Sequence, residues 1–479
     1  MRVYNTLTKQ KEDLQPREPG KVSMYVCGVT PYDYLHIGHA RTFIVYDMIR
    51  RYLEHAGYEV YHLENITDVE DKIIDRASQT GEEPLKLAER FAREAARDTE
   101  ALGLLKPHVR PKVSDHIAEI IELIERLLQA GAAYEAAGSV YFDVSEFSRY
   151  GQLSGRSLDD LPVERIEHLE EKTDPKDFAL WKKAKEGEPA WESPWGQGRP
   201  GWHIECSAMS TKYLGPGFDV HGGARELIFP HHENELAQSE AGTGVHPFVR
   251  YWLHSGVLNV GGEKMSKSLG NFITVRDMLK RTTPQVLRML FLTAHYRSPL
   301  DFTDGCLQQA TAALQRVQAA LREATRRLDQ AAPGDEVSSS ELTDAVESAR
   351  DQFEAAMQDD LNTAQAIAGL FDLVTELNRL TTALPEPTPA AAVPTIAAAR
   401  DTLVELFGVL GFADLDEELY GGSLAEELVE LLTEYRRESR QQKNYQFADR
   451  IRDDLRGLGV ALEDHSQGTS WHFDPALRG

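Results

Sequence analysis

The hydrophobic pattern near the start of the chain predicts a strand, a helix and a second strand. Residues 23–29 (SMYVCGV) are a short apolar run that ends in turn residues. In residues 40–57, apolar side chains recur at helical spacing and Gly57 ends the pattern. Residues 58–67 (YEVYHLENIT) return to β character. A βαβ start of this kind is typical of a doubly wound parallel sheet, which binds ligands at the carboxyl ends of its strands.

The pattern changes twice further along the chain. Residues 115–200 contain a helical stretch, an apparent hairpin and a loop rich in Trp, Pro and Gly, which predicts a subdomain inserted into the sheet domain. After about residue 305, helices rich in Ala, Leu, Glu and Arg predict a bundle. We therefore predict an α/β fold: a Rossmann-like doubly wound parallel sheet with an inserted subdomain, followed by an α-helical bundle and a small C-terminal α+β unit. The predicted domains are 1–114 with 201–255, 115–200, 256–304, 305–415 and 424–479.

Composition supports a folded chain of several domains. The 479 residues are 41% apolar and 27% charged, which suits about two to four domains. The N-terminal residues lack the apolar core of a signal peptide, and no apolar run has membrane-spanning length, so we expect a cytoplasmic protein without membrane contact. Cysteines at 27, 206 and 306 are too scattered for a disulfide framework, in keeping with a reducing compartment.

The net charge of −25 weighs mildly against nucleic-acid binding, because phosphate binding relies on Lys and Arg. Residues 434–457 nevertheless form a local basic segment, with Tyr445, Phe447 and Trp471 nearby for stacking on unpaired bases. A solvated helix of mixed charge explains this segment equally well. Its basic residues are Arg436, Arg437, Arg440, Lys443, Arg450, Arg452 and Arg456.

Two short motifs are candidates for phosphate binding. In HIGH (36–39), Gly38 lies between His36 and His39 at a predicted helix start, where unpaired amides and the positive dipole end favour an anion. In NVGGEKMSKSLGN (259–271), Lys264 and Lys267 lie in a glycine-bracketed loop and suit a triphosphate. Ordinary surface histidines and a solvated loop are the alternatives. Neither motif is a Walker A sequence. GQGRPG (196–201) fits the GxGxxG pattern of dinucleotide-binding sites, but it does not link a strand to a helix and so has little weight as such a site.

A third set of residues is chemically suited to zinc. His231 and Glu235 lie four apart in a predicted helix and so share a face. With Cys27 and Cys206 they offer two thiolates, an imidazole and a carboxylate. HExxH is not satisfied because Leu236 replaces its second histidine, which disfavours a zincin protease. Spacing alone does not make these four positions a site, since free cysteines are more often buried as small apolar residues.

The ordered pair of HIGH and KMSKS (264–268) resembles the two signatures of class I aminoacyl-tRNA synthetases. The segments MYVCG, NITDVEDKI, GWHIECSAM, FPHHENE and KMSKSLGN resemble, more narrowly, the cysteinyl-tRNA synthetase family. The likeness extends through DDLNTAQAIAGLFDL to the C-terminal residues. It implies a KMSKS and stem-contact region at 256–304, a tRNA-binding bundle at 305–415 and an anticodon-binding unit at 424–479.

The resemblance also implies roles for single residues, and a reaction. One Zn²⁺ would be bound by Cys27, Cys206, His231 and Glu235. ATP, with Mg²⁺, would be bound by His36, Gly38, His39, Gly222, Gly223, Lys264 and Lys267, of which His36, His39, Lys264 and Lys267 would be catalytic. Thr67 and Trp202 would line the amino-acid pocket. The implied enzyme is a ligase that activates L-cysteine with ATP, releases pyrophosphate, and transfers cysteine to the 3′-terminal adenosine of tRNA(Cys), acting as a monomer.

Zinc would explain how cysteine is distinguished from serine. Shape alone separates substrates that differ by a small group by about 1 to 3 kcal/mol, whereas a sulfur-preferring ion rejects a hydroxyl. We therefore expect no editing domain. Because a catalytic zinc usually keeps an open position, we expect either that Glu235 is the weak or distant ligand or that the metal becomes five-coordinate when the substrate thiolate binds.

Two alternatives remain at the level of sequence. An ATP-dependent ligase that couples cysteine to an aminosugar, as in mycothiol synthesis, would share the zinc and ATP residues, and the order of CGVTPYD leans toward it. The HHENE carboxylate and the final unit favour the synthetase. A non-catalytic zinc-dependent RNA-binding protein would be expected to have lost HIGH or KMSKS, and both motifs are present.

Overall fold

The computed structural model describes residues 1–157, 171–265, 271–333, 340–413, 415, 421–458, 460–465 and 468–473, with some side chains, including that of Lys264, left out. The chain divides into two compact units, Met1–Ala413 and Asp414–Gly479. Among the described helices, none combines the length and the apolar character that crossing a membrane requires.

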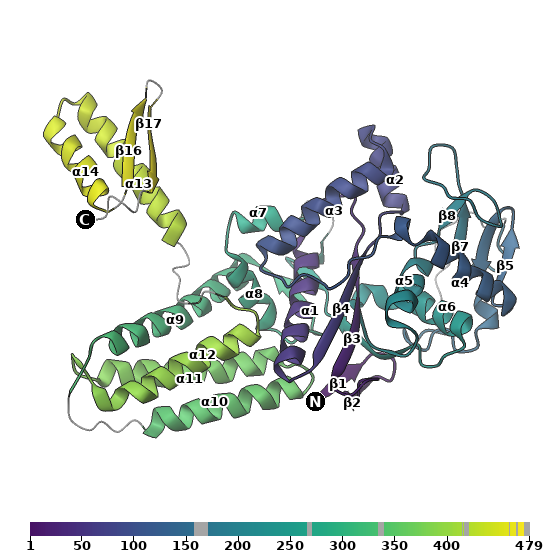
Figure 1. Cartoon of the computed structure of the whole chain (residues 1–479), viewed down its shortest axis with the longest axis horizontal. Helices are drawn as coiled ribbons and strands as arrows, with labels where there is room; N and C mark the ends of the chain where they lie inside the picture. The colour runs from purple at the N-terminus through teal and green to yellow at the C-terminus, as the bar shows by residue number, and fades with distance from the viewer. Residues whose placement is uncertain are drawn as a thin grey trace. The chain divides into compact units, whose positions relative to one another are not determined.

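A parallel sheet lies at the centre of the first unit (Figure 1). Its strand order is β10-β9-β3-β4, and each neighbouring pair is parallel. This confirms the predicted parallel sheet and its βαβ start. The strands are β3 (Lys21–Val29), β4 (Glu59–Ile66), β9 (Phe218–Ala224) and β10 (Val249–Ser255), and helix α1 (Ile37–His55) connects the first two.

Helices cover both faces of this sheet. Successive side chains of a strand point to opposite faces, and in β3 both Met24 and Tyr25 are fully buried. Tyr25 belongs to a core that includes residues of α4 (Ile117–Gln129), α5 (Ile204–Leu214) and α6 (Glu233–Thr243). Helix α1 contacts β4 and β9. The remaining elements near the sheet are β1 (Arg2–Asn5), β2 (Gln10–Asp13), α2 (Asp71–Thr80) and α3 (Pro84–Ala101).

The predicted insertion contains a separate antiparallel sheet of order β5-β6-β7-β8. The predicted hairpin is present, because β5 pairs with β6. Helix α4 packs on α5 and α6, so its apolar residues join the core beside the parallel sheet. The four strands are β5 (Ala133–Ala136), β6 (Ser139–Phe142), β7 (Phe178–Lys183) and β8 (Gly198–Pro200).

A three-stranded sheet follows β10, where the second phosphate motif begins. Its order is β12-β11-β13, with β11 antiparallel to β12 and parallel to β13. The elements are β11 (Leu258–Val260), β12 (Glu263–Lys264), α7 (Val275–Leu279), α8 (Pro284–Leu292) and β13 (Leu300–Phe302).

Four long helices form the predicted bundle (Figure 1). They are α9 (Asp304–Asp329), α10 (Ser340–Gln358), α11 (Thr363–Ala383) and α12 (Val393–Val409), with short strands β14 (Ala331–Ala332) and β15 (Thr388–Pro389) pairing beside them. The second unit contains α13 (Gly421–Gln441), α14 (Tyr445–Gly457) and a hairpin of β16 (Val460–His465) and β17 (Gly468–Phe473). The predicted α+β character of the C-terminal unit is therefore confirmed. The predicted domain boundaries stay predictions.

Candidate active site and metal centre

The four residues predicted to bind zinc come together beside the carboxyl end of β3. Cys27 lies near the end of that strand, Cys206 on α5, and Glu235 on α6, while His231 lies in a π-helical turn before α6. Each offers a ligand atom, these atoms all lie within 4.8 Å of one another, and all four residues are buried. The fold therefore assembles a donor set of mixed sulfur, nitrogen and oxygen character.

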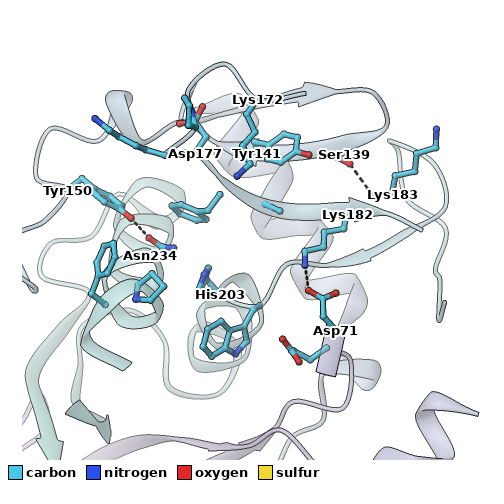
Figure 2. A pocket seen from close by; sticks show the side chains of 18 of the residues that line it. Asp71, Ser139, Tyr141, Tyr150, Lys172, Asp177, Lys182, Lys183, His203 and Asn234 are labelled. Carbon is cyan, nitrogen blue, oxygen red and sulfur yellow. Dashed lines mark hydrogen bonds and ion pairs between the residues drawn. The ribbon is translucent and has the colours of Figure 1, made fainter. Parts of the chain in front are cut away.

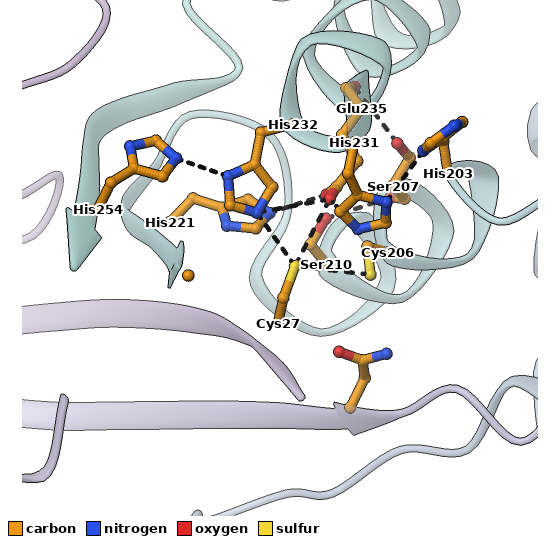
Figure 3. A network of polar contacts seen from close by, with 12 residues as sticks. Cys27, His203, Cys206, Ser207, Ser210, His221, His231, His232, Glu235 and His254 are labelled. Atoms are coloured by element: carbon orange, nitrogen blue, oxygen red, sulfur yellow. Dashed lines mark hydrogen bonds and ion pairs between the residues drawn. The ribbon is translucent and has the colours of Figure 1, made fainter. Parts of the chain in front are cut away.

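Close contacts within this cluster join the two sulfurs to each other, and join the sulfur of Cys27 and the imidazole of His231 to the carboxylate of Glu235 (Figure 3). The sulfur of Cys27 lies 4.0 Å from that of Cys206 and 3.6 Å from Oε1 of Glu235. Nε2 of His231 lies 2.7 Å from the same Oε1. The second oxygen of Glu235 lies 2.8 Å from Nε2 of His221.

The protonation of the cluster suits a cation. Burial opposes ionisation of Glu235, yet the nearby His221 and His231 lower its pKa to about 2. Burial also opposes charge on His231, but the carboxylate of Glu235 and the thiol of Cys206 raise its pKa to about 10. The contact with Cys27 lowers the pKa of the Cys206 thiol, whereas burial raises that of Cys27. Buried anionic oxygen and sulfur atoms need a compensating positive charge. Protonated His231 supplies that charge here, and a metal ion would supply it once His231 loses its proton to become a ligand, so these donors fit a metal ion.

A second donor set overlaps the first. Cys27, His221, His232 and Glu235 also place their ligand atoms within 4.8 Å of one another. This set has one thiol where the first has two, and a metal that prefers sulfur would favour the first.

A directed chain of hydrogen bonds ends on the sulfur of Cys27. Burial lowers the pKa of His232 well below its usual range and that of His254 to about 3, so both rings are neutral. With hydrogens assigned from the contacts, the Thr6 hydroxyl donates to Nδ1 of His254 at 2.8 Å, and Nε2–H of His254 donates to Nδ1 of His232 at 2.7 Å. Nε2–H of His232 then donates to the sulfur at 3.2 Å. The direction follows from Cys27, because its S–H faces the acceptor oxygen of Glu235 and its sulfur therefore accepts from His232, which places the proton of each ring on Nε2.

The other predicted ligand histidine is held in a similar way. Nδ1 of His231 lies 2.9 Å from Nδ1 of His203, and burial lowers the pKa of His203 well below its usual range. The neutral ring of His203 therefore accepts a hydrogen bond from His231, which leaves Nε2 of His231 directed at the cluster. Trp202, predicted to line the amino-acid pocket, packs on His231 with ring centroids 4.6 Å apart.

Four histidines of the cluster were missed by the sequence analysis: His203, His221, His232 and His254. His221 and His254 lie on the adjacent strands β9 and β10, whereas His203 lies at the start of α5 and His232 in the π-helical turn before α6. Local patterning does not contain this arrangement. A sequence signal was available, since three of these histidines, His203, His221 and His232, lie in or beside segments that the sequence analysis already quoted or assigned, GWH, HGG and HHENE.

A cavity of about 390 Å³ opens beside Trp202 and His203 (Figure 2). The inserted sheet and the start of α2 form its walls. The lysines of its wall are Lys72, Lys172, Lys176, Lys182 and Lys183. Lys182 is paired with Asp71 at 2.7 Å. Thr67, the other predicted pocket residue, is buried just after β4, where its hydroxyl accepts a hydrogen bond from Asn65 at 3.0 Å.

The start of α1 differs in one respect from the sequence prediction. Nδ1 of His36 accepts hydrogen bonds from the amides of Gly38 and His39, at 3.1 and 3.4 Å, and the amide of Ile37 donates to the carbonyl of Ile273 at 3.1 Å. The expectation of unpaired amides at this helix start is therefore wrong, because the protein caps them itself. Since Nδ1 of His36 accepts, its proton in the neutral ring lies on Nε2.

His39 completes the capping box. Its Nδ1 accepts from the amide of His36 at 3.3 Å. Burial, together with the charges of His36 and Lys72, lowers the pKa of His39 well below its usual range. His39 is therefore a neutral donor through Nε2–H. The absence of a side chain at Gly38 is required here, since a Cβ would lie 2.9 Å from the His36 ring.

The remaining predicted ATP residues are placed in part. Gly222 and Gly223 lie in β9, where Tyr46 of α1 packs on them and accepts a hydrogen bond from the Gly223 amide at 2.6 Å. This packing alone demands a glycine at 222, because a Cβ would lie 2.3 Å from the Tyr46 ring. Lys264 pairs through its backbone with Asn259, and Lys267 lies outside the described residues.

The chain matches two protein-family models and is similar to known enzymes over almost its whole length. Residues 13–312 match the family model for the catalytic domain of tRNA synthetases class I (C), and residues 352–414 match the DALR domain. A cysteine–tRNA ligase from Thermococcus onnurineus (strain NA1) is 51% identical over 475 residues, which cover 98% of both chains. Another, from Heliobacterium modesticaldum (strain ATCC 51547 / Ice1), is 50% identical and covers 98% of this chain and 99% of its own.

A solved structure shares the fold at low sequence identity. Mycobacterium tuberculosis methionyl-tRNA synthetase, in complex with methionyl-adenylate, superposes with a TM-score of 0.59 and 16% identity, covering 86% of this chain and 94% of that one. Residues 13–312, which match the catalytic-domain model, include the residues of the buried donor cluster, of the start of α1 and of the cavity beside Trp202.

Proposed function

The chain belongs to the cysteine–tRNA ligases of the class I tRNA synthetase family, and from that premise we propose how its own residues perform the reaction. In the first step, the carboxylate of L-cysteine attacks the α-phosphorus of Mg²⁺-bound ATP, which gives cysteinyl adenylate and pyrophosphate. In the second, a ribose hydroxyl of the 3′-terminal adenosine of tRNA(Cys) attacks the activated carbonyl carbon and releases AMP and a proton. The observation that carries the assignment is the buried donor cluster beside the cavity at Trp202.

Cys27, Cys206, His231 and Glu235 are the proposed zinc ligands. A zinc ion held there supplies a sulfur-preferring centre that favours the thiol of cysteine over the hydroxyl of serine. Glu235 is the proposed weakest ligand, because each of its oxygens already contacts a histidine, His231 or His221. His203 and His232 orient His231 and Cys27 through their hydrogen bonds.

The ATP phosphates are proposed to lie over the start of α1. The neutral His39 ring supplies a hydrogen-bond donor rather than a positive charge. Positive charge for the developing transition state then has to come from Lys264, Lys267 and Mg²⁺, together with the positive end of the helix dipole. Gly222 and Gly223 are retained as the proposed neighbours of the adenosine.

Two surfaces are proposed to bind tRNA(Cys). The first is the set of lysines that line the cavity beside Trp202, because this cavity adjoins the proposed amino-acid pocket and lysines attract the phosphates of the 3′ end. In the C-terminal unit, a cavity of about 310 Å³ is lined by Arg436, Arg437 and Arg440. Exposed Tyr445 and Phe447 belong to the same unit and are available for stacking on unpaired bases, which suits an anticodon loop. We propose that the reaction takes place in the cytoplasm. We also propose that the active chain is a monomer, and light scattering tests its molar mass in solution.

The proposed function is tested by pyrophosphate exchange followed by charging. The purified enzyme should exchange pyrophosphate into ATP with cysteine and not with serine. Removal of zinc by a chelator should abolish the exchange, and added zinc should restore it. Total tRNA should then accept cysteine. Exchange without charging would favour an aminosugar acceptor, and chelator-resistant exchange would contradict the zinc assignment.

A further inference from the structure

A buried arginine joins the HIGH helix to the base of the lysine-bearing hairpin. Arg41 lies two residues after His39 on α1, and it is 1% exposed. Its two terminal nitrogens donate to the backbone carbonyls of Val257 and Ser298. Burial lowers the pKa of Arg41 to about 10, so the guanidinium remains charged at neutral pH. A buried charge is thus directed at two carbonyls from separate segments.

These two segments carry the three-stranded sheet. Val257 directly precedes β11, and Ser298 precedes β13, which pairs in parallel with β11. Strand β11 in turn pairs with β12, which places the backbone of Lys264 opposite Asn259. The base of the hairpin is closely packed, because a Cβ on Gly256 would lie 2.1 Å from the carbonyl oxygen of Ser298. A shift at this base would therefore be carried to the strand that bears Lys264.

The far flank of the same loop is held by the helix start. The amide of Val275 donates to the carbonyl of Leu35 at 2.8 Å, and the amide of Ile37 donates to that of Ile273 at 3.1 Å. Backbone contacts thus fix residues 273–275, whereas the near flank is fixed to α1 through the side chain of Arg41. A single substitution of Arg41 removes the contacts of the near flank, whereas the contacts of the far flank are made by backbone atoms and do not depend on a side chain.

We propose that Arg41 is a positioning residue for adenylate formation, which holds the strand bearing Lys264 in register with His36 and His39. The inference rests on the proposed function, because the proposed function is what assigns charge stabilisation to Lys264. An arginine suits the task, since its planar fork presents two donors at a fixed separation, whereas a lysine presents a single point of attachment. Displacement of a catalytic group by about 1 Å is enough to cost about 100-fold in rate.

The test compares Arg41→Lys and Arg41→Met with Arg288→Met in the full chain. Arg288, on α8, is equally buried and bonds to Asp47 and to the carbonyl of Leu410, so its loss removes a buried guanidinium without touching the hairpin. Pyrophosphate exchange gives kcat and the KM values for ATP and cysteine, and thermal unfolding is measured in parallel. Single-turnover transfer from preformed cysteinyl adenylate to tRNA gives the second step alone.

Arg41→Met should lower kcat for exchange by about 100-fold, with the KM for cysteine and the transfer rate within about twofold of wild type. Arg41→Lys should recover part of the loss, and Arg288→Met should retain kcat despite a lower melting temperature. Wild-type kcat in Arg41→Met, or an equal fall in exchange and transfer, would overturn the inference. If Arg41→Met does not fold, Arg41→Lys decides, and unaltered kcat overturns it. A wild-type enzyme without exchange would instead overturn the proposed function itself.

Discussion

Nε2 of His232 lies 3.2 Å from the sulfur of Cys27, whose S–H faces the acceptor oxygen of Glu235, so the histidine is the donor in that contact. The relationship matters because the sulfur of Cys27 is common to both donor sets, whereas His232 belongs only to the alternative one. A neutral ring that donates to the Cys27 sulfur fixes its orientation, and it would stabilise the anionic form of that sulfur once a metal ion is bound. His232 is therefore better explained as a partner of a ligand than as a ligand.

Replacing this donor should weaken metal binding. In His232→Phe the sulfur of Cys27 loses its hydrogen bond, and loss of such an outer partner typically costs about 10 to 100-fold in metal affinity. Competition with a chromophoric chelator measures the zinc affinity directly. His62→Phe is the matched control, because His62 is buried and its ring nitrogens have no hydrogen-bond partner among the described residues. Equal affinities in wild type and His232→Phe would contradict the assignment.

The two overlapping donor sets are separated by Cys206, which only one of them contains. Cys206→Ser should remove bound zinc and lower cysteine-dependent exchange by at least about 100-fold, since a hydroxyl is a poor zinc ligand compared with a thiolate. Metal content by mass spectrometry and exchange kinetics measure both effects. Cys306→Ser, at the half-buried cysteine near the start of α9, should retain both. A zinc-replete, active Cys206→Ser would transfer the site to the set that contains His221 and His232.

Local pattern was sufficient for the first βαβ unit, and not for the site built on it. The strand 23–29 and the helix after it were predictable because their periodicity is local, and they appear as β3 and α1. Cys27 and Cys206 were predicted as zinc ligands from the motifs that contain them, although the 4.0 Å separation of their sulfurs depends on tertiary packing. His254 was not predictable as a member, since β10 reaches β3 only across β9.

The helix start shows a different limit of sequence reasoning. Position in the chain indicated that the amides of Gly38 and His39 would be unpaired, which is the general rule for helix termini. The structure caps them with the His36 ring, and this depends on a side-chain rotamer that no pattern of residue types reports. The histidines were therefore identified correctly as special, and their local role was misjudged.

Stability should depend on pH through His62. Burial, aided by the charges of Arg50, His108 and Arg110, lowers the pKa of His62 to about 3, whereas an unfolded histidine titrates near about 6.5. Between these values the unfolded chain binds the extra proton. The contribution of His62 is thus complete above about pH 6.5 and is lost as pH falls toward 3, by about 1.4 kcal/mol per pH unit.

His62→Phe removes that titration. Urea unfolding between about pH 7.5 and 5 should give a shallower fall in the free energy of unfolding for His62→Phe than for wild type, with the difference confined to pH below about 6.5. The parallel comparison cancels the contributions of the other buried histidines. Identical pH profiles for the two proteins would show that His62 titrates normally in the folded chain.

Lysines at the cavity beside Trp202 should act on tRNA and not on activation. Lys176 and Lys183 line that cavity and form no ion pair within the described part of the chain. A paired substitution, Lys176→Glu with Lys183→Glu, replaces attraction for phosphates by repulsion, so the KM for tRNA should rise by about tenfold or more and its salt dependence should weaken.

Pyrophosphate exchange should stay within about twofold of wild type, because neither lysine touches the metal cluster or the helix start. Lys21→Glu with Lys106→Glu, at two exposed lysines paired with Glu18 and Glu100, makes the same change in net charge and serves as the control. Unaltered charging by the double variant would place the acceptor end elsewhere, whereas loss of exchange and charging together would instead assign these lysines to the amino-acid or ATP site.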